Sequence, residues 1–274
     1  MIDQYAVMGD PISHSKSPLI HRCFAQQAQQ AMEYHALQVS AKEFKTKITK
    51  FFKDGGKGLN ITVPLKELAW ELVDQRSPLA ERAGAVNTIS LHQDKLLGAN
   101  TDGIGLVRDI IQNHKGSLAN KKILILGAGG AVRGVLEPVL LQQPESVTIV
   151  NRTVEKANNL HGLFADLGEV RACAYNELEH RPFDLIINGT SASLHGQLPP
   201  LNHAVIGQNT WCYDMMYSND KTLFNGWAEA QGAEKILDGL GMLVEQAAEA
   251  FYIWRGIRPD TASVIEKIKQ GNKP

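Results

Sequence analysis

Hydrophobic positions along the chain follow two alternating patterns. Short runs of adjacent aliphatic residues, as at 123–126, are typical of strands buried on both faces. Between such runs, apolar residues recur every three or four positions, as Phe44, Ile48 and Phe51 do, which is typical of helices with one buried face. The repeated alternation predicts an α/β fold with mostly parallel strands. We expect strands at 5–9, 34–39, 58–63, 85–91, 95–100, 123–126, 146–150, 170–174, 183–188 and 211–217, and helices at 18–30, 41–53, from 64, from 101, after the turn at 127–131, and at 154–166, 240–254 and 261–270.

A glycine-rich turn follows the aliphatic run at 123–126, and a helical pattern begins directly after it. Glycines let the backbone turn sharply and let a phosphate approach the amide groups at a helix N-terminus. In the G-x-G-x-x-G pattern the third glycine would stand at position 132, where this chain has Val132. The turn therefore fits either a dinucleotide site or an ordinary strand–turn–helix corner. Its residues are Gly127, Ala128, Gly129, Gly130 and Ala131.

The end of the next strand indicates which dinucleotide would bind. Sites for NAD usually have an acidic residue there, about 20 residues after the glycine turn, to hold the ribose 2′-hydroxyl. Here the position holds Asn151, followed by Arg152, Thr153 and, one turn further, Lys156. Loss of the anion and gain of two cations favour a 2′-phosphate, hence NADPH. Alternatively, the two cations are solvated residues at a helix start.

The first half of the chain carries a polar loop ahead of a helix. Ser17 and Pro18 fit an N-cap serine followed by proline at the first helical position. That interpretation leaves Ser15 and Lys16 unexplained, whereas two hydroxyls and an ammonium at a helix N-terminus suit a small carboxylate.

Two ionisable residues stand at the starts of predicted helices. Lys66 lies in a first turn, where the helix dipole disfavours its charged form, so it is a candidate proton donor. Asp102 either complements a helix dipole or pairs with Lys66. Alternatively, Lys66 is an ordinary lysine exposed to solvent, which is the commoner case for any one lysine.

Later segments hold further candidates. Met215 and Tyr217 share one face at the end of a strand, where they could cover a nicotinamide ring and face a substrate, or form ordinary core packing. Gln246 is polar near an apolar helix stripe and needs a partner if buried. The segment Gly189-Thr190-Ser191-Ala192-Ser193 follows a strand and is expected to border the cofactor.

Composition excludes several classes of function. The net charge of −1 indicates no general attraction to nucleic acid or to anionic membranes. No apolar run approaches the roughly 20 residues needed to span a bilayer, and the first residues lack the pattern of a signal peptide. Three widely spaced cysteines predict reduced thiols in a cytoplasmic protein. The nine histidines show no metal-ligand spacing, so no metal is expected.

Taken together, the motifs resemble those of the shikimate dehydrogenase family over nearly the whole chain. They are Ser13-His14-Ser15-Lys16-Ser17-Pro18, Asn60-Ile61-Thr62-Val63-Pro64-Leu65-Lys66, Gly84-Ala85-Val86-Asn87-Thr88, Asn100-Thr101-Asp102-Gly103, Gly127-Ala128-Gly129-Gly130-Ala131, Asn151-Arg152-Thr153, Tyr213-Asp214-Met215 and Asp238-Gly239-Leu240-Gly241-Met242. The resemblance implies NADPH-dependent reduction of 3-dehydroshikimate to shikimate, in the shikimate pathway of aromatic amino-acid biosynthesis. It implies Lys66 and Asp102 as the catalytic pair.

The resemblance also implies the residues that contact the two ligands. For the substrate they are Ser15, Ser17, Thr62, Asn87, Asp102, Tyr217 and Gln246. For the cofactor NADP(H) they are residues 127–131, Asn151, Arg152, Thr153, Lys156, Met215 and Gly239. We expect this small-molecule substrate as the only partner. We expect the protein itself to be a monomer or a homodimer.

A helix ending near residues 115–117 gives the expected domain boundary. We predict a substrate-binding catalytic domain over 1–116, joined by C-terminal helices at about 240–274. A Rossmann-like, doubly wound NADP-binding domain is predicted over 117–239, with a cleft between the two.

Three other functions compete with this one. A quinate/shikimate dehydrogenase with relaxed use of NAD and NADP is the nearest, and Asn151 argues against it. A non-catalytic NADPH-binding regulator would have no reason to keep Lys66 with Asp102. A reductase with a nucleophilic cysteine is the third, but Cys23, Cys173 and Cys212 lack the flanking residues such a nucleophile needs.

Overall fold

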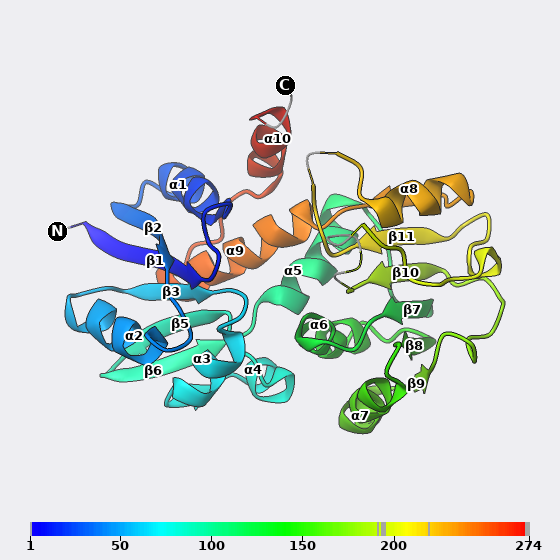
Figure 1. Cartoon of the computed structure of the whole chain (residues 1–274). Coiled ribbons are helices and arrows are strands. Elements are labelled where there is room, and N and C mark those ends of the chain that lie inside the picture. Colours follow the sequence, from blue (N-terminus) through cyan, green and yellow to red (C-terminus); the bar gives the residue numbers. More distant parts are fainter. Residues whose placement is uncertain (1, 191, 193–195, 219, 272–274) are drawn as a thin grey trace. The chain divides into compact units, whose positions relative to one another are not determined.

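The computed structural model describes residues 2–190, 192, 196–218 and 220–271 of the chain. These form two compact units (Figure 1). The first comprises Met1–Gly105 and Leu243–Gly271, and the second comprises Leu106–Met242. Ser191 and Ser193, which the sequence placed near the cofactor, lie outside the described residues.

The first unit is built on a six-stranded mixed sheet in the order β2-β1-β3-β5-β6-β4. Strands β1, β2 and β3 are parallel, β5 is antiparallel to β3 and β6, and β4 is parallel to β6. The strands are β1 (Asp3–Gly9), β2 (Met32–Gln38), β3 (Gly58–Ile61), β4 (Gln75–Arg76), β5 (Thr88–His92) and β6 (Lys95–Ala99). The helices are α1 (Ser17–Gln27), α2 (Phe44–Lys53), α3 (Lys66–Leu72), α4 (Pro78–Ala83), α5 (Asp102–Arg108), α9 (Leu240–Arg255) and α10 (Ala262–Gly271).

Helices cover both faces of this sheet, because alternate residues of its strands are apolar on both sides. Ala6 and Met8 of β1 pack in one core with Ile48 of α2. Tyr5 of β1 points the other way, where its ring stacks at 4.9 Å on Trp254 of α9. Helix α1 lies on that second side, packed against β1 and β2 (Figure 1).

The second unit is a six-stranded, fully parallel sheet in the order β9-β8-β7-β10-β11-β12. This is the strand order of doubly wound dinucleotide-binding sheets, in which successive strands are added outward on one side of β7 and then, from β10 on, on its other side. The strands are β7 (Lys122–Leu126), β8 (Ser146–Val150), β9 (Val170–Cys173), β10 (Leu185–Asn188), β11 (Trp211–Asp214) and β12 (Lys235–Leu237). The helices are α6 (Gly130–Leu140), α7 (Val154–Phe164) and α8 (Leu223–Ala230), with short helical turns η1 (Asp109–Asn113), η2 (Ala165–Leu167) and η4 (His203–Val205). The mixed and parallel sheets confirm the predicted α/β fold class.

Residues 106–116, which the sequence assigned to the first domain, pack in the second unit. Leu106, Val107 and Ile110 are buried with Ile123 and Val135 in the core of the parallel sheet. Helix α5 begins in one unit and continues as a π-helical turn in the other, so its regular apolar pattern contains no signal for the boundary.

Some predicted element boundaries are wrong by a few residues. Helix α1 begins at Ser17, so the N-cap position belongs to Lys16 rather than to the serine. Helix α3 begins at Lys66 with Leu65 at the N-cap, and not at Pro64. The strand predicted to run to residue 217 ends at Asp214.

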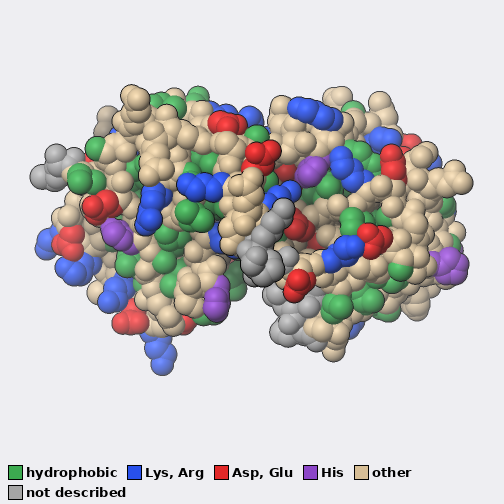
Figure 2. Space-filling view, turned by 90° about the horizontal axis from the view of Figure 1, so that it is seen from above, with side chains coloured by type: hydrophobic (Ala, Val, Ile, Leu, Met, Phe, Trp, Pro, Cys, Tyr) green, Lys and Arg blue, Asp and Glu red, His purple; other side chains and the backbone are tan. Residues whose placement is uncertain are grey.

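Charges of both signs are interspersed over the face of the molecule in Figure 2, in keeping with the net charge of −1. Within the described ranges, no helix has both the length and the apolar character needed to cross a membrane.

Candidate active site

The first unit brings together two charged side chains that are 36 positions apart in the sequence. Lys66, the first residue of α3, donates a hydrogen bond from Nζ to Asp102 Oδ2 at 2.6 Å. The two side chains are 26% and 12% exposed, so the pair is reachable yet largely shielded from water. An ammonium paired with a carboxylate at this depth can deliver or accept a proton next to a bound molecule.

Asn87, at the end of the segment before β5, holds the other oxygen of Asp102. Its Nδ2 donates to Asp102 Oδ1 at 2.8 Å and to Thr101 Oγ1 at 2.9 Å. Gln246 of α9 reaches the same cluster, since its Oε1 lies 3.4 Å from Thr101 Oγ1 and 3.5 Å from Asn87 Nδ2. The structure therefore places four of the predicted residues, Lys66, Asn87, Asp102 and Gln246, in one hydrogen-bonded group.

The polar loop before α1 contributes two hydroxyls. The Ser17 amide donates to Ser15 Oγ at 3.3 Å, and Ser17 itself is 8% exposed. Thr62, just after β3, packs where Gly9 has no side chain, because a Cβ at position 9 would lie 2.4 Å from the Thr62 methyl. These three residues come from two segments: Ser15 and Ser17 from the connection between β1 and α1, and Thr62 from the connection after β3.

In the second unit the glycine turn lies between β7 and α6, beside the segment that follows β10. Gly127 has a φ of +102°, a conformation that favours glycine, and a side chain there would approach Thr190. Residues 129–131 are exposed, no side chain caps α6, and a Cβ at Gly129 would meet nothing within 4 Å. The first amides of α6 are thus open to an anion, which fits the diphosphate of a dinucleotide.

The residues after β8 fit the remaining part of such a ligand. Asn151 Nδ2 donates to the Thr153 carbonyl at 2.8 Å, which fixes the chain just ahead of α7. Arg152 and Lys156 are exposed at that helix start. The guanidinium of Arg152 lies near Tyr175. Burial raises the pKa of Tyr175 to about 12, and the charge of Arg152 acts in the opposite direction. Two accessible cations suit a phosphate on the ribose.

Met215 and Gly239 contact one another in the second unit. A Cβ on Gly239 would lie 2.2 Å from the Met215 carbonyl oxygen, so only glycine fits there. The Met215 sulfur lies 3.2 Å from the position of a Cβ on Gly189, after β10. Tyr217 is half-buried, and burial raises the pKa of its hydroxyl, which therefore stays protonated and can donate a hydrogen bond.

Two of the three cysteines are poorly suited to act as nucleophiles. All three are free thiols, and burial raises the pKa of Cys173 and takes that of Cys212 to about 12. Since the thiolate is the reactive form, these two thiols are inert near neutral pH. Among the described residues, no group of three or more His, Cys, Asp or Glu side chains could hold a metal ion.

Four members of the first unit's polar group were absent from the predicted site: Tyr34, Asn60, Thr88 and Thr101. Asn60 stood out in the sequence as a polar residue within an apolar strand, and Thr101 precedes Asp102 in a run of polar residues. Tyr34 and Thr88 are common strand residues, and nothing in the sequence marks them.

A parallel dinucleotide-type sheet with an open glycine turn, joined to a unit that holds a shielded lysine–aspartate pair, defines the class of two-unit α/β dehydrogenases. Within that class, the chain belongs to the shikimate dehydrogenase family. Three family models match the chain. They are the shikimate dehydrogenase substrate binding domain over residues 7–89, shikimate / quinate 5-dehydrogenase over 109–196, and the shikimate 5'-dehydrogenase C-terminal domain over 239–269.

Individual relatives agree over the full length. A shikimate dehydrogenase (NADP(+)) of Hahella chejuensis is 56% identical over 271 residues, covering 99% of this chain and 100% of the relative. The crystal structure of an Ael1 enzyme from Pseudomonas putida is 46% identical with a TM-score of 0.93, covering 97% of each chain. Shikimate 5-dehydrogenase from Thermus thermophilus, solved in complex with NADP(H) and shikimate, is 30% identical with a TM-score of 0.86, covering 100% of each chain.

Proposed function

We propose that the chain reduces 3-dehydroshikimate to shikimate with NADPH, reversibly, and that Lys66 and Asp102 handle the proton. The observation that carries this proposal is the 2.6 Å contact between Lys66 Nζ and Asp102 Oδ2, with Asn87 on the second carboxylate oxygen. Family membership supplies the substrate class. The non-catalytic regulator would have no use for this shielded pair.

The residues of the second unit that would hold the cofactor are those whose geometry fits it. The amides at 129–131 would bind the diphosphate, and Asn151, Arg152, Thr153 and Lys156 would bind the ribose 2′-phosphate. Met215 and Gly239 would border the nicotinamide. The chemistry that a bound nicotinamide supplies is hydride transfer to or from the carbon bearing the reacting oxygen.

The protein's own part is the proton. During reduction the forming alkoxide takes a proton from the Lys66 ammonium, which becomes a neutral amine, and the proton is restored from solvent. Asp102 stays a carboxylate that orients the lysine and the reacting hydroxyl. Ser15 and Ser17 would hold the substrate carboxylate, Thr62, Asn87 and Gln246 its ring hydroxyls, and Tyr217 remains a predicted substrate contact.

One assay tests the proposal and its nearest alternative. Purified protein is mixed with shikimate or quinate and with NADP⁺ or NAD⁺, and the absorbance of reduced nicotinamide is followed. We expect turnover of shikimate with NADP⁺ at an efficiency about tenfold or more above that with NAD⁺, because Arg152 and Lys156 favour the phosphate. Equal efficiency with both cofactors, or faster oxidation of quinate, would instead indicate the relaxed quinate/shikimate enzyme.

The cellular location and the oligomeric state are also part of the proposal. Three free thiols suit the reducing cytoplasm, where the pathway's small-molecule intermediates would be the partners. Light scattering on the purified protein distinguishes the monomer from the homodimer.

A further inference from the structure

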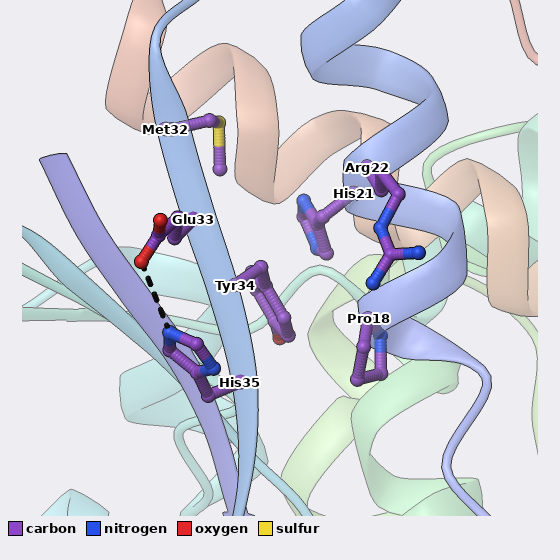
Figure 3. Close-up of a pocket in the computed structure, with 7 residues that line it drawn as sticks. All are labelled: Pro18, His21, Arg22, Met32, Glu33, Tyr34 and His35. Atoms are coloured by element: carbon purple, nitrogen blue, oxygen red, sulfur yellow. Dashed lines mark ion pairs between the residues drawn. The ribbon is translucent and has the colours of Figure 1, made fainter. Parts of the chain in front are cut away.

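Tyr34 is connected to Asp102 of the candidate active site by a line of hydrogen bonds through Asn60, Thr88 and Asn87. It lies on β2, is 8% exposed, and lines a pocket between α1 and β2 with Pro18 and His21 (Figure 3). The His21 ring stacks on the Tyr34 ring at 4.2 Å with an interplanar angle of 8°. The phenol is thereby held in one orientation, with its hydroxyl directed at Asn60, to whose Oδ1 it donates at 2.7 Å.

The direction of the hydrogen bonds from Asn60 is fixed by a backbone group. Asn60 Nδ2 lies 3.2 Å from the Asn87 carbonyl oxygen, which can only accept, so the amide nitrogen must face that way. The same Nδ2 donates to Thr88 Oγ1 at 3.1 Å. Asn60 Oδ1 consequently faces Tyr34, and the Tyr34 hydroxyl must be the donor.

A second backbone group fixes Asn87 in the same manner. The Thr101 amide donates to Asn87 Oδ1 at 2.9 Å, so the oxygen of this side chain faces Thr101 and its nitrogen faces Asp102. Thr88, which accepts from Asn60, donates its one proton to Asn87 Oδ1 at 2.9 Å. Every donor in the line therefore points toward the Asp102 carboxylate.

A hydrogen-bond line with one direction polarises its members, and each bond strengthens the next. All of its links are buried: Asn60, Asn87 and Thr88 are 6%, 3% and 1% exposed. Burial also raises the pKa of Tyr34 well above its usual value, so the hydroxyl keeps its proton. A hydrogen bond from the Ser17 side chain opposes that rise and links the same hydroxyl to the serine loop.

We propose that Tyr34 is a positioning residue, which acts through Asn60 and Thr88 to hold Asn87 against Asp102. This inference rests on the proposed function of the Lys66–Asp102 pair, and it adds a residue that is not among the predicted substrate and cofactor contacts. Loss of the Tyr34 hydroxyl leaves Asn60 Oδ1 without its donor and frees the amide to turn. Asn87 then holds Asp102 less rigidly.

The test compares two tyrosines of neighbouring strands. Tyr34→Phe removes the donor and keeps the ring on His21. Tyr5→Phe is the matched control, because Tyr5 pairs with Tyr34 in the β1–β2 register and is 2% exposed, but its hydroxyl contacts Arg255 instead. We expect Tyr34→Phe to lower kcat for shikimate oxidation about tenfold, with KM changed less than about twofold, and Tyr5→Phe to change kcat less than about twofold. Equal kcat values for the two variants would overturn the proposal.

A double variant tests the route. Thr88→Val removes the side-chain link between Asn60 and Asn87 and leaves the bond from Asn60 to the Asn87 carbonyl. If Tyr34 acts through Thr88, Tyr34→Phe combined with Thr88→Val should be no slower than Thr88→Val alone. Losses that multiply would show that Tyr34 acts by another route, and would overturn the proposal. Melting temperatures of all variants identify any loss that comes from unfolding.

A ligand-free measurement separates this inference from the proposed function. Absence of shikimate-dependent NADP⁺ reduction by the unmodified protein would refute the function. The hydrogen bonds between Tyr34 and Asn87 can be followed without any ligand, by NMR of the Asn87 side-chain amide. Its resonances are assigned by their disappearance in Asn87→Asp. They should shift in Tyr34→Phe and stay in place in Tyr5→Phe; equal shifts in the two variants would refute the positioning role.

Discussion

Replacement of Lys66 by methionine tests the catalytic pair most directly. The change keeps an unbranched side chain only one atom shorter, and removes its charge and its donors. Asp102 loses a partner at 2.6 Å but keeps the Asn87 donor at 2.8 Å, so the carboxylate should stay in place. Proton transfer by a positioned side chain contributes about 10²- to 10⁴-fold, and we expect kcat to fall about 10³-fold. Since the two side chains are 26% and 12% exposed, the free energy of unfolding should drop by only about 1–3 kcal/mol.

The assay is initial-rate oxidation of shikimate with NADP⁺, accompanied by calorimetric titration of shikimate. Affinity should change less than about threefold, because Ser15, Ser17 and Asn87 remain. Lys50→Met is the control: Lys50 of α2 lies 2.7 Å from Asp54, the residue that follows this helix, and the two side chains are 71% and 57% exposed. An exposed pair contributes about 0–1 kcal/mol, and its loss should leave kcat unchanged. A folded Lys66→Met protein with more than about a tenth of normal turnover would remove this lysine from the mechanism.

Three further changes test other parts of the structure. Arg152→Ser should raise KM for NADP⁺ about tenfold and leave KM for NAD⁺ nearly unchanged, which steady-state kinetics with both cofactors will show. Gly239→Ala forces a methyl to within 2.2 Å of a backbone oxygen and should cost about 1–3 kcal/mol in urea unfolding, whereas Gly226→Ala, within α8 with nothing within 4 Å, should add about 0.5–1 kcal/mol. Burial lowers the pKa of His21 to about 3 from 6.5, so the unfolded chain binds the extra proton and stability should fall as pH drops from 6.5 toward 3, by about 2 kcal/mol at pH 5. His21→Phe should flatten that slope in urea titrations, and His35→Gln, at an exposed position on β2, should retain it.

Much of the fold could be predicted because its signals are local. The aliphatic run of β7 and the glycines after it identify the first strand and turn of the parallel sheet from a few adjacent residues. The site was harder to predict, because Lys66 and Asp102 are 36 positions apart and meet only in the folded first unit. Their pairing rested on the family resemblance, and the spacing alone left it open.

The line of hydrogen bonds from Tyr34 to Asp102 could not be predicted from the sequence for a different reason. It crosses the sheet from β2 to β5, and its members become neighbours through the order β2-β1-β3-β5. Tyr34 and Thr88 have the high strand propensity expected anywhere in such a sheet, so their polar atoms carry no separate signal. The unit boundary at Gly105 was missed because α5 runs through it without a break in its apolar pattern.

The interrupted course of the first unit has a consequence for biosynthesis. Its sheet strands leave the ribosome early, but Trp254, which stacks on Tyr5 and donates to the Ile89 carbonyl at 3.1 Å, is translated only after the whole segment 106–242. At about 5–20 residues per second that delay is on the order of ten seconds. During this interval the aromatic face of the nascent sheet has α1 but lacks α9, while the inserted parallel sheet, continuous in the chain, can already close. Translation order therefore favours completion of the inserted unit first, and leaves the flanking one dependent on its last helices.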